Sequence, residues 1–150
     1  MILITSAAYV GNDLISELGK LPPSFLPCQN LRLYRHQLDL FNSQDERVVL
    51  SIPNDYVLEK NDREYLNRRK VEIVRVPVNI ALGSSIVYVL NYLARYEESL
   101  RILYGDTLFK NIGLEKDICY VSSVTENYNW DFVDEANSDL IFSGYFSFSD

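Results

Sequence analysis

The feature that most constrains the fold is a regular exchange between short apolar runs and longer segments with helical spacing. The runs are rich in Ile, Val and Leu with little polar alternation, which is typical of strands buried on both faces. Four such runs occupy 1–5, 47–53, 71–78 and 100–104. Segments with helical spacing lie between them, at 30–41, 56–69 and 84–96. Strand, helix and strand in this order imply right-handed crossovers, so we expect an α/β fold with a mainly parallel sheet.

Apolar residues in two of the helical segments recur at spacings of three and four, which places them on one side of each helix. The stripes comprise Leu31, Tyr34, Leu38 and Phe41 in the first helix, and Ile86, Val89, Leu90 and Leu93 in the third. Ser84 or Ser85 has the hydroxyl of an N-cap for the third helix. We therefore expect both helices to pack on the sheet.

Beyond Asp106 the pattern changes. Strand-like pieces follow one another with polar turns between them and no helical spacing, at 118–124, 130–133 and 140–148. This arrangement is typical of antiparallel pairing. We expect one domain over 1–150, with a parallel first half and an antiparallel extension.

The charge balance argues against several classes of partner. Fourteen basic residues stand against 21 acidic ones, and a formal charge of −7 repels nucleic-acid backbones and anionic membranes. Cys28 and Cys119 are isolated, which is typical of reduced cytosolic thiols rather than a zinc site or disulfide framework. No apolar run reaches the roughly 18 residues of a membrane span. We expect a cytoplasmic protein that binds neither nucleic acid nor membrane. A small anionic ligand is still compatible with the negative net charge, because Mg²⁺ or backbone N–H groups can bind it locally.

In a doubly wound sheet, ligands bind beyond the carboxyl ends of the strands, so the loop after the first strand is informative. This loop contains small residues and one glycine, namely Ala7, Ala8, Gly11 and Asn12. Small side chains let the backbone approach a base or phosphate, and a following helix N-terminus favours an anion. The same residues also serve simply to let a strand and a helix pack, so both interpretations stay open.

The fourth strand ends in Gly105 and Asp106. A carboxylate at the carboxyl edge of a strand suits Mg²⁺, which prefers one or two carboxylates plus phosphate oxygens. The pair is equally compatible with an ordinary turn.

Several segments together resemble sugar-phosphate nucleotidyltransferases. The stretch LPPSFLP at 21–27, followed by RHQL at 35–38, resembles the family's "LPKPLLP" and "rQL" segments. Gly83 and Ser84 resemble its mid-domain glycine segment, and the YGD at 104–106 resembles its Mg²⁺-binding aspartate segment. The FSGYF at 142–146 resembles its "aGiyvF" strand. These pieces occur in the family's order and at about its spacing, across nearly the whole chain.

The resemblance implies a Rossmann-like mixed sheet and the reaction of NTP with a sugar 1-phosphate to give NDP-sugar and pyrophosphate. Catalysis of this in-line attack consists mostly of positioning and charge neutralisation. It further implies that Asp106 holds Mg²⁺ and that a nearby cation, for which Lys20 is the candidate, assists. The roles implied for the other positions are base and phosphate binding by Ala7, Ala8, Gly11 and Asn12, ribose contact by Gly83 and Ser84, and a sugar-site position for Gly144. Surface (capsular) polysaccharide synthesis is the implied setting.

The chain also departs from this family. The Arg of the family's glycine loop falls at Asp13, and the Lys of its "PKP" stretch falls at Pro23. Replacing Arg by Asp reverses the sign of a Coulomb energy of about 4 kcal/mol at 4 Å and an effective dielectric constant of 20. Transfer is then slow or absent unless Lys20 or Arg32 compensates. The family's second metal-binding aspartate falls beyond position 150, so we expect these residues to be the N-terminal part of a longer chain.

The departures keep a second function class open, a catalytically inactive nucleotide-binding or assembly module that retained the fold. A dehydrogenase-like dinucleotide binder is disfavoured, because it needs GxGxxG after the first strand and this loop has a single glycine. The residues specify neither the nucleotide nor the sugar phosphate, and they are compatible with an oligomer.

Overall fold

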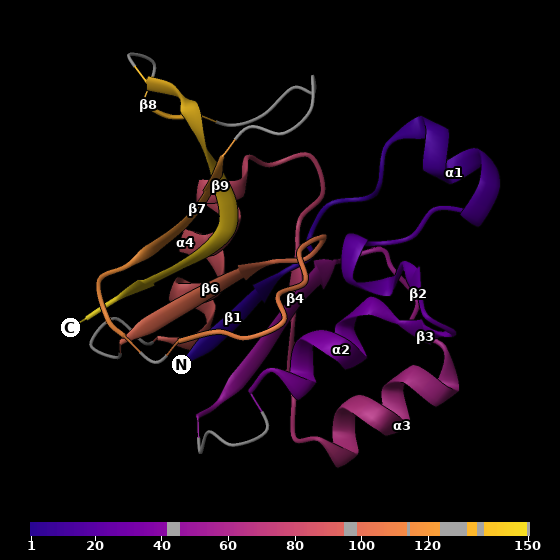
Figure 1. The fold of residues 1–150 in the computed structure, drawn as a ribbon. Helices are drawn as coiled ribbons and strands as arrows, with labels where there is room; N and C mark the ends of the chain where they lie inside the picture. Colours follow the sequence, from indigo (N-terminus) through magenta and orange to yellow (C-terminus); the bar gives the residue numbers. More distant parts are fainter. Residues whose placement is uncertain (42–45, 95–98, 114, 124–131, 135–136, 150) are drawn as a thin grey trace.

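The computed structural model describes residues 1–41, 46–94, 99–113, 115–123, 132–134 and 137–149 (Figure 1). Its centre is a mixed sheet in the order β5-β4-β1-β6-β9-β7, with β8 also paired to β9. Helices α2 and α3 lie on one face of the sheet, and α4 lies on the other (Figure 1). The expected α/β architecture is confirmed.

The parallel half of the sheet contains the four strands expected from the apolar runs. β1 (Ile2–Thr5) lies between β4 (Val48–Pro53) and β6 (Leu100–Tyr104), and β5 (Glu72–Val76) lies outside β4. β1 is buried along its whole length, because side chains on both of its faces meet a helical layer. A strand that is apolar on both faces, as β1 is, suits the centre of the sheet.

The antiparallel half is built on the long strand β9 (Asn137–Phe148). It pairs with β6 on one side and with β7 (Cys119–Ser123) and β8 (Phe132–Asp134) on the other, always antiparallel. The predicted antiparallel extension is therefore confirmed. Trp130 and Val124, which were assigned to strands from the sequence, lie outside the described residues.

Two apolar cores hold the helices against the sheet. On one face, α2 (Leu33–Asp39) and α3 (Lys60–Arg68) place Tyr34, Leu38 and Leu66 against the sheet. On the other, α4 (Leu82–Leu93) contributes the fully buried Val89, with Ile86, Leu90 and Leu93 packed around it. Within the described residues, no helix is long and apolar enough to cross a membrane.

The helix predicted over 30–41 begins later than its apolar spacing indicates. β2 (Pro27–Cys28) and β3 (Leu31–Arg32) form an antiparallel ribbon closed by Gln29 and Asn30, which both have positive φ. The left-handed conformation of these two residues stops a helix from starting there. Leu31 therefore precedes the helix and is exposed, so the prediction that it shares one side of a helix with Tyr34 and Leu38 is wrong.

Two other helix starts also differ from the prediction. α4 begins at Leu82 with Ala81 at its N-cap and no side-chain cap, so neither Ser84 nor Ser85 has the predicted capping role. The helix predicted over 56–69 begins at Lys60, because Tyr56 and Leu58 are buried in the core ahead of it. Tyr96, the predicted end of the third helix, lies outside the described residues.

Candidate functional site

The loop after β1 and the turn after β6 lie side by side at the carboxyl edge of the sheet. Their strands are paired in parallel with Thr5 opposite Tyr104, and the ladder continues one step further, where Gly105 N donates to Thr5 O at 2.8 Å. The two segments that were expected to share a ligand are thus neighbours. This edge is where doubly wound sheets bind their ligands.

Gly105 is required by this close approach. A Cβ at this position would lie 2.5 Å from Thr5 O and 3.0 Å from both Ser24 Oγ and Ser6 Cβ. The nearest atom is backbone, which cannot rotate away. The glycine therefore brings the turn that carries Asp106 directly against the end of β1.

Three buried serines connect the segments at this edge, and sequence reasoning missed them. Ser6 N donates to Ser51 O at 3.1 Å, and Ser6 Oγ accepts from Ser24 N at 2.9 Å. Ser24, in the short helix η1 (Pro23–Phe25), donates through Oγ to Gly105 O at 3.1 Å. The available signal was a serine within or just after an apolar run, as at Ser51 and Ser6, where a hydroxyl can bond to backbone groups.

Asp106 is exposed at the tip of the turn, and Thr107 Oγ1 donates to its Oδ1 at 3.2 Å. Gly144 of β9 lies behind this turn, since a Cβ on Gly144 would lie 2.5 Å from Thr107 Oγ1. Its φ of +84° is a second reason for glycine at this position. The structure thus brings Gly144 and the Asp106 turn together.

Lys20 is engaged by a cluster that joins the first loop to the segment after β4. Its Nζ lies 3.2 Å from Asp55 Oδ2 and 4.1 Å from the centroid of the Tyr9 ring. Tyr9 donates its hydroxyl to Asp55 Oδ1 at 2.6 Å. The Tyr9 hydrogen bond, followed by Lys20, lowers the pKa of Asp55, while burial and the same hydrogen bond raise the pKa of Tyr9. We call Tyr9, Lys20 and Asp55 the lysine clasp.

No protein-family model and no curated protein matches the sequence. Solved structures match the fold. A nucleoside-diphosphate-sugar pyrophosphorylase from Vibrio cholerae RC9 aligns over 99% of this chain and 73% of its own, with 17% identity and a TM-score of 0.69. An inositol-1-phosphate CTP transferase from T. maritima aligns over 99% and 69%, with 18% identity and a TM-score of 0.65. A UDP-glucose pyrophosphorylase complexed with UDP-glucose covers 99% and 73%, with 12% identity and a TM-score of 0.51.

The chain has the sugar-phosphate nucleotidyltransferase fold. The fold that the sequence resemblance implied is therefore confirmed. At identities of 12–18%, the shared fold does not show that the reaction is shared.

Within this nucleotidyltransferase fold, the first loop is open. Ala8, Gly11 and Asn12 are exposed, whereas Ala7 is half-buried against the core under α4. A Cβ on Gly11 would meet nothing within 4 Å, so packing does not explain this glycine. The following helix α1 (Asn12–Leu18) buries no residue and projects from the body of the protein (Figure 1). Asp13 is exposed on its first turn.

Gly83 and Ser84 lie in the first turn of α4, which follows β5 and so starts at the same edge of the sheet. Both are exposed, and a Cβ on Gly83 would meet nothing within 4 Å. They line an open hollow of about 520 Å³ with Pro77, Ile80 and Val87. This position leaves their backbone accessible to a ligand.

Two arginines near the site, like Lys20, have hydrogen-bond partners. Besides Lys20, Arg32 donates to Phe25 O at 2.9 Å and to Glu59 at 3.0 Å. Arg75 Nη1 donates to Asn54 O and Tyr56 O, beside the lysine clasp.

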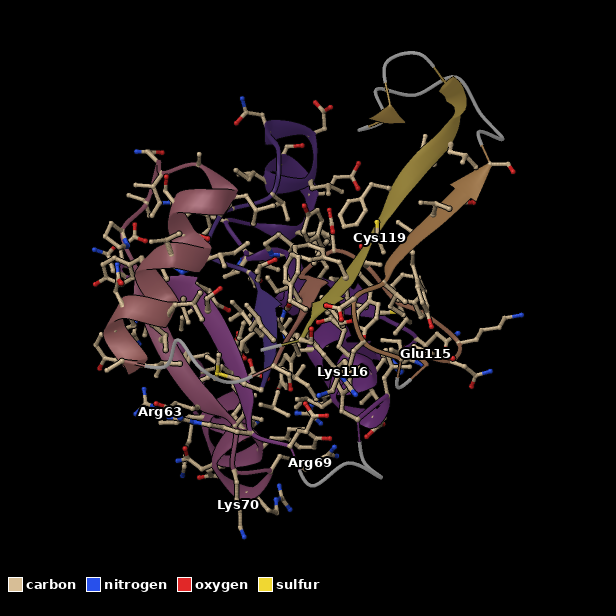
Figure 2. The ribbon with its side chains drawn as sticks, turned by 90° about the vertical axis from the view of Figure 1, so that its left-hand side faces the viewer. Arg63, Arg69, Lys70, Glu115, Lys116 and Cys119 are labelled. Atoms are coloured by element: carbon tan, nitrogen blue, oxygen red, sulfur yellow. The ribbon has the colours of Figure 1, made fainter. Side chains whose placement is uncertain are left out.

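The cluster at the end of α3 is remote from the site. Figure 2 shows Arg69 and Lys70 at the end of the molecule opposite to α1, and Arg69 pairs with Asp39 at 3.0 Å. Both residues precede β5 and so lie at the amino edge of the parallel strands. They cannot reach phosphates bound at the carboxyl edge.

Asp106 fits a Mg²⁺ ligand as a single carboxylate. Across the described ranges, no group of three or more His, Cys, Asp or Glu side chains forms a self-contained metal site. An exposed carboxylate at the carboxyl edge, beside an open loop, nevertheless matches the preference of Mg²⁺ for one or two carboxylates completed by phosphate oxygens and water. The donor set therefore fits a metal that arrives with a nucleotide.

Proposed function

We propose that this chain is a nucleotidyltransferase domain that forms NDP-sugar and pyrophosphate from an NTP and a sugar phosphate. The observation that carries the proposal is the contact between two segments: Gly105 packs on Thr5 O, so the Asp106 carboxylate lies beside the open first loop. A triphosphate lying along that loop has its phosphates within reach of the carboxylate. The proposed setting is surface polysaccharide synthesis, where sugar 1-phosphates are activated in this way.

The proposed reaction is a single displacement. An oxygen of the sugar phosphate attacks the α-phosphorus of the NTP, and the bond to the β-phosphate oxygen breaks, so pyrophosphate leaves. Bound at Asp106, Mg²⁺ would neutralise charge on the phosphate oxygens. The exposed backbone at Ala8, Gly11 and Asn12 is proposed to hold the base and phosphates. Gly83 and Ser84 are proposed to face the ribose.

The remaining roles concern the acceptor and the leaving group. Gly144, which packs behind the Asp106 turn, is proposed to border the sugar site. Lys20 is proposed to supply positive charge to the departing pyrophosphate after leaving Asp55. Both side chains are exposed, and an exposed ion pair adds little stability, so binding a triphosphate can readily offset its loss.

A second candidate function is a catalytically inactive nucleotide-binding or assembly module. It is favoured by Asp13 and Pro23, which stand where the resemblance implies cations, and by the pairing of Lys20 with Asp55. Under this alternative the open loop binds nucleotide without turnover, or the fold serves only in assembly.

Two measurements separate these functions. Thermal unfolding with Mg²⁺ and each NTP tests binding, because a ligand at 100 times its Kd adds about 2.7 kcal/mol to stability. Pyrophosphate release with a panel of sugar 1-phosphates tests turnover. We expect both with the native protein and a loss of release in Asp106→Asn. Binding without release supports the inactive module, and stability that no NTP changes contradicts both functions that use nucleotide.

A further inference from the structure

The polar side chain of Gln37 is fully buried in α2, among apolar residues of the core. Its Nε2 lies within hydrogen-bond distance of three carbonyl oxygens, Tyr104 O at 3.1 Å, Gly105 O at 3.1 Å and Thr107 O at 2.8 Å. All three belong to the turn that carries Asp106. An element remote in sequence thus holds the backbone on both sides of this carboxylate.

The orientation of the Gln37 amide is fixed by these acceptors. Carbonyl oxygens only accept hydrogen bonds, so the amide nitrogen must face them and the amide oxygen must point away. Gln37 Oε1 has no hydrogen-bond partner among the described residues. A buried amide oxygen without a partner costs stability, whereas the amide nitrogen is hydrogen-bonded to the turn. The polar contribution of Gln37 therefore lies in its N–H groups and is directed to the turn.

These hydrogen bonds anchor the backbone of the turn from inside the protein, which is unusual for a turn at the surface. Within the turn, Thr107 N donates to Tyr104 O at 3.1 Å, and Ser24 Oγ adds a further bond to Gly105 O. With the Gln37 bonds, the carbonyls at 104, 105 and 107 all point into the protein. Asp106 between them is exposed, and its carboxylate accepts a hydrogen bond from Thr107 Oγ1 at 3.2 Å.

We propose that Gln37 is a positioning residue for Asp106, which holds the carboxylate in the place where it meets a metal bound to nucleotide phosphates. The proposal rests on the proposed function. Gln37 touches neither substrate nor metal; it acts through the turn. A carboxylate displaced by about 1 Å loses a metal that demands near-octahedral geometry.

The test uses Mn²⁺ as a spectroscopic probe with each NTP and two variants of Gln37. Gln37→Met keeps the length of the side chain and removes its donors, and Gln37→Glu, which is protonated when buried, leaves a single O–H donor for the three carbonyls. Leu38→Ala is the matched control, because it removes from the same helix a buried side chain that donates no hydrogen bond to the turn. All binding is measured well below the melting temperature of each variant.

We expect both Gln37 variants to raise the Kd for Mn²⁺, measured with saturating nucleotide, by at least tenfold. The Kd for nucleotide without metal should change less than twofold, and excess Mn²⁺ should restore the ternary complex. Leu38→Ala should lower the melting temperature and leave the Kd for Mn²⁺ unchanged. Where neither Gln37 variant folds, Ser24→Ala removes the other side-chain donor to this turn and should weaken Mn²⁺ in the same direction.

Two results overturn the proposal, and they are distinguishable. If the native protein forms a Mn²⁺–nucleotide complex and the Gln37 variants bind Mn²⁺ equally well, or lose metal and nucleotide together, Gln37 is only structural. If the native protein forms no such complex with any NTP, the proposed function fails and the role of Gln37 fails with it.

Discussion

Lys20 and Asp55 face each other across the first loop, 3.2 Å apart, with the Tyr9 ring beneath the ammonium group. The candidate site therefore offers less positive charge than the presence of Lys20 in the sequence implies. Only the structure reveals this, because residues 35 positions apart share no sequence pattern. At the scale of single residues, the electrostatics of the site depend on this carboxylate.

Asp55→Asn should increase the affinity for NTP. The change removes a negative charge beside the proposed phosphates and frees Lys20, and we expect a gain of about fivefold, or about 1 kcal/mol. Calorimetric titration with Mg²⁺ and the preferred NTP measures it. Asp39→Asn is the control, since it changes the net charge equally but its partner Arg69 lies at the opposite edge of the sheet. Equal gains in the two variants would show a general charge effect rather than release of Lys20.

The stabilising effect of the lysine clasp should depend on pH, because its Asp55 carboxylate takes up a proton in acid. Its bonds lower the pKa of Asp55, so the folded value lies below the unfolded one, about 3.9. The contribution of the clasp to stability is therefore present above about pH 4 and is lost as pH falls through the lower folded value. In Tyr9→Phe the largest cause of the shift is absent, and the pKa of Asp55 should rise toward its usual range. Carboxyl NMR titration of both proteins measures this, and identical Asp55 curves would refute the clasp.

At the scale of elements, the strands followed from the sequence and the helix starts did not. β6 begins and ends where its apolar run does, because burial on both faces leaves a continuous signal. The start of α2 depended on two positive φ angles at Gln29 and Asn30. Asn readily adopts this conformation, whereas Gln does not, so at most Asn30 was a sign of it in the sequence. In the candidate site, Asp106 was predicted from its place after a strand, whereas Gln37 lay in a helical segment and in the RHQL stretch at 35–38, neither of which indicated a role. Its role depends on a turn 67 to 70 residues away.

Gly105→Ala should destabilise the fold by separating β6 from β1. The new methyl would lie 2.5 Å from Thr5 O, and overpacking of this kind costs about 1–3 kcal/mol. Gly83→Ala is the contrasting variant, since its methyl meets nothing and an alanine in a helix gains about 0.5–1 kcal/mol. Urea unfolding of both variants measures the difference. A Gly105→Ala protein as stable as the native one would mean that the turn does not press on β1.

At the scale of the whole molecule, the fold places a cationic cluster far from the candidate site. The chain has a formal charge of −7, and the cations at 69 and 70 lie at the amino edge of the sheet. A triphosphate approaching the carboxyl edge thus finds an open loop, the exposed Asp106, and Lys20, Arg32 and Arg75 already paired. Such a site favours a nucleotide that arrives with its divalent cation, and it should bind free NTP weakly.

The most direct test is a crystal structure of the protein grown with an NTP and Mn²⁺, with the metal located by its anomalous scattering. We predict a metal peak at about 2.0–2.2 Å from an Asp106 carboxylate oxygen, bridged to phosphates that follow residues 7–12. A nucleotide bound at any other part of the surface, or a metal held without Asp106, would contradict the account.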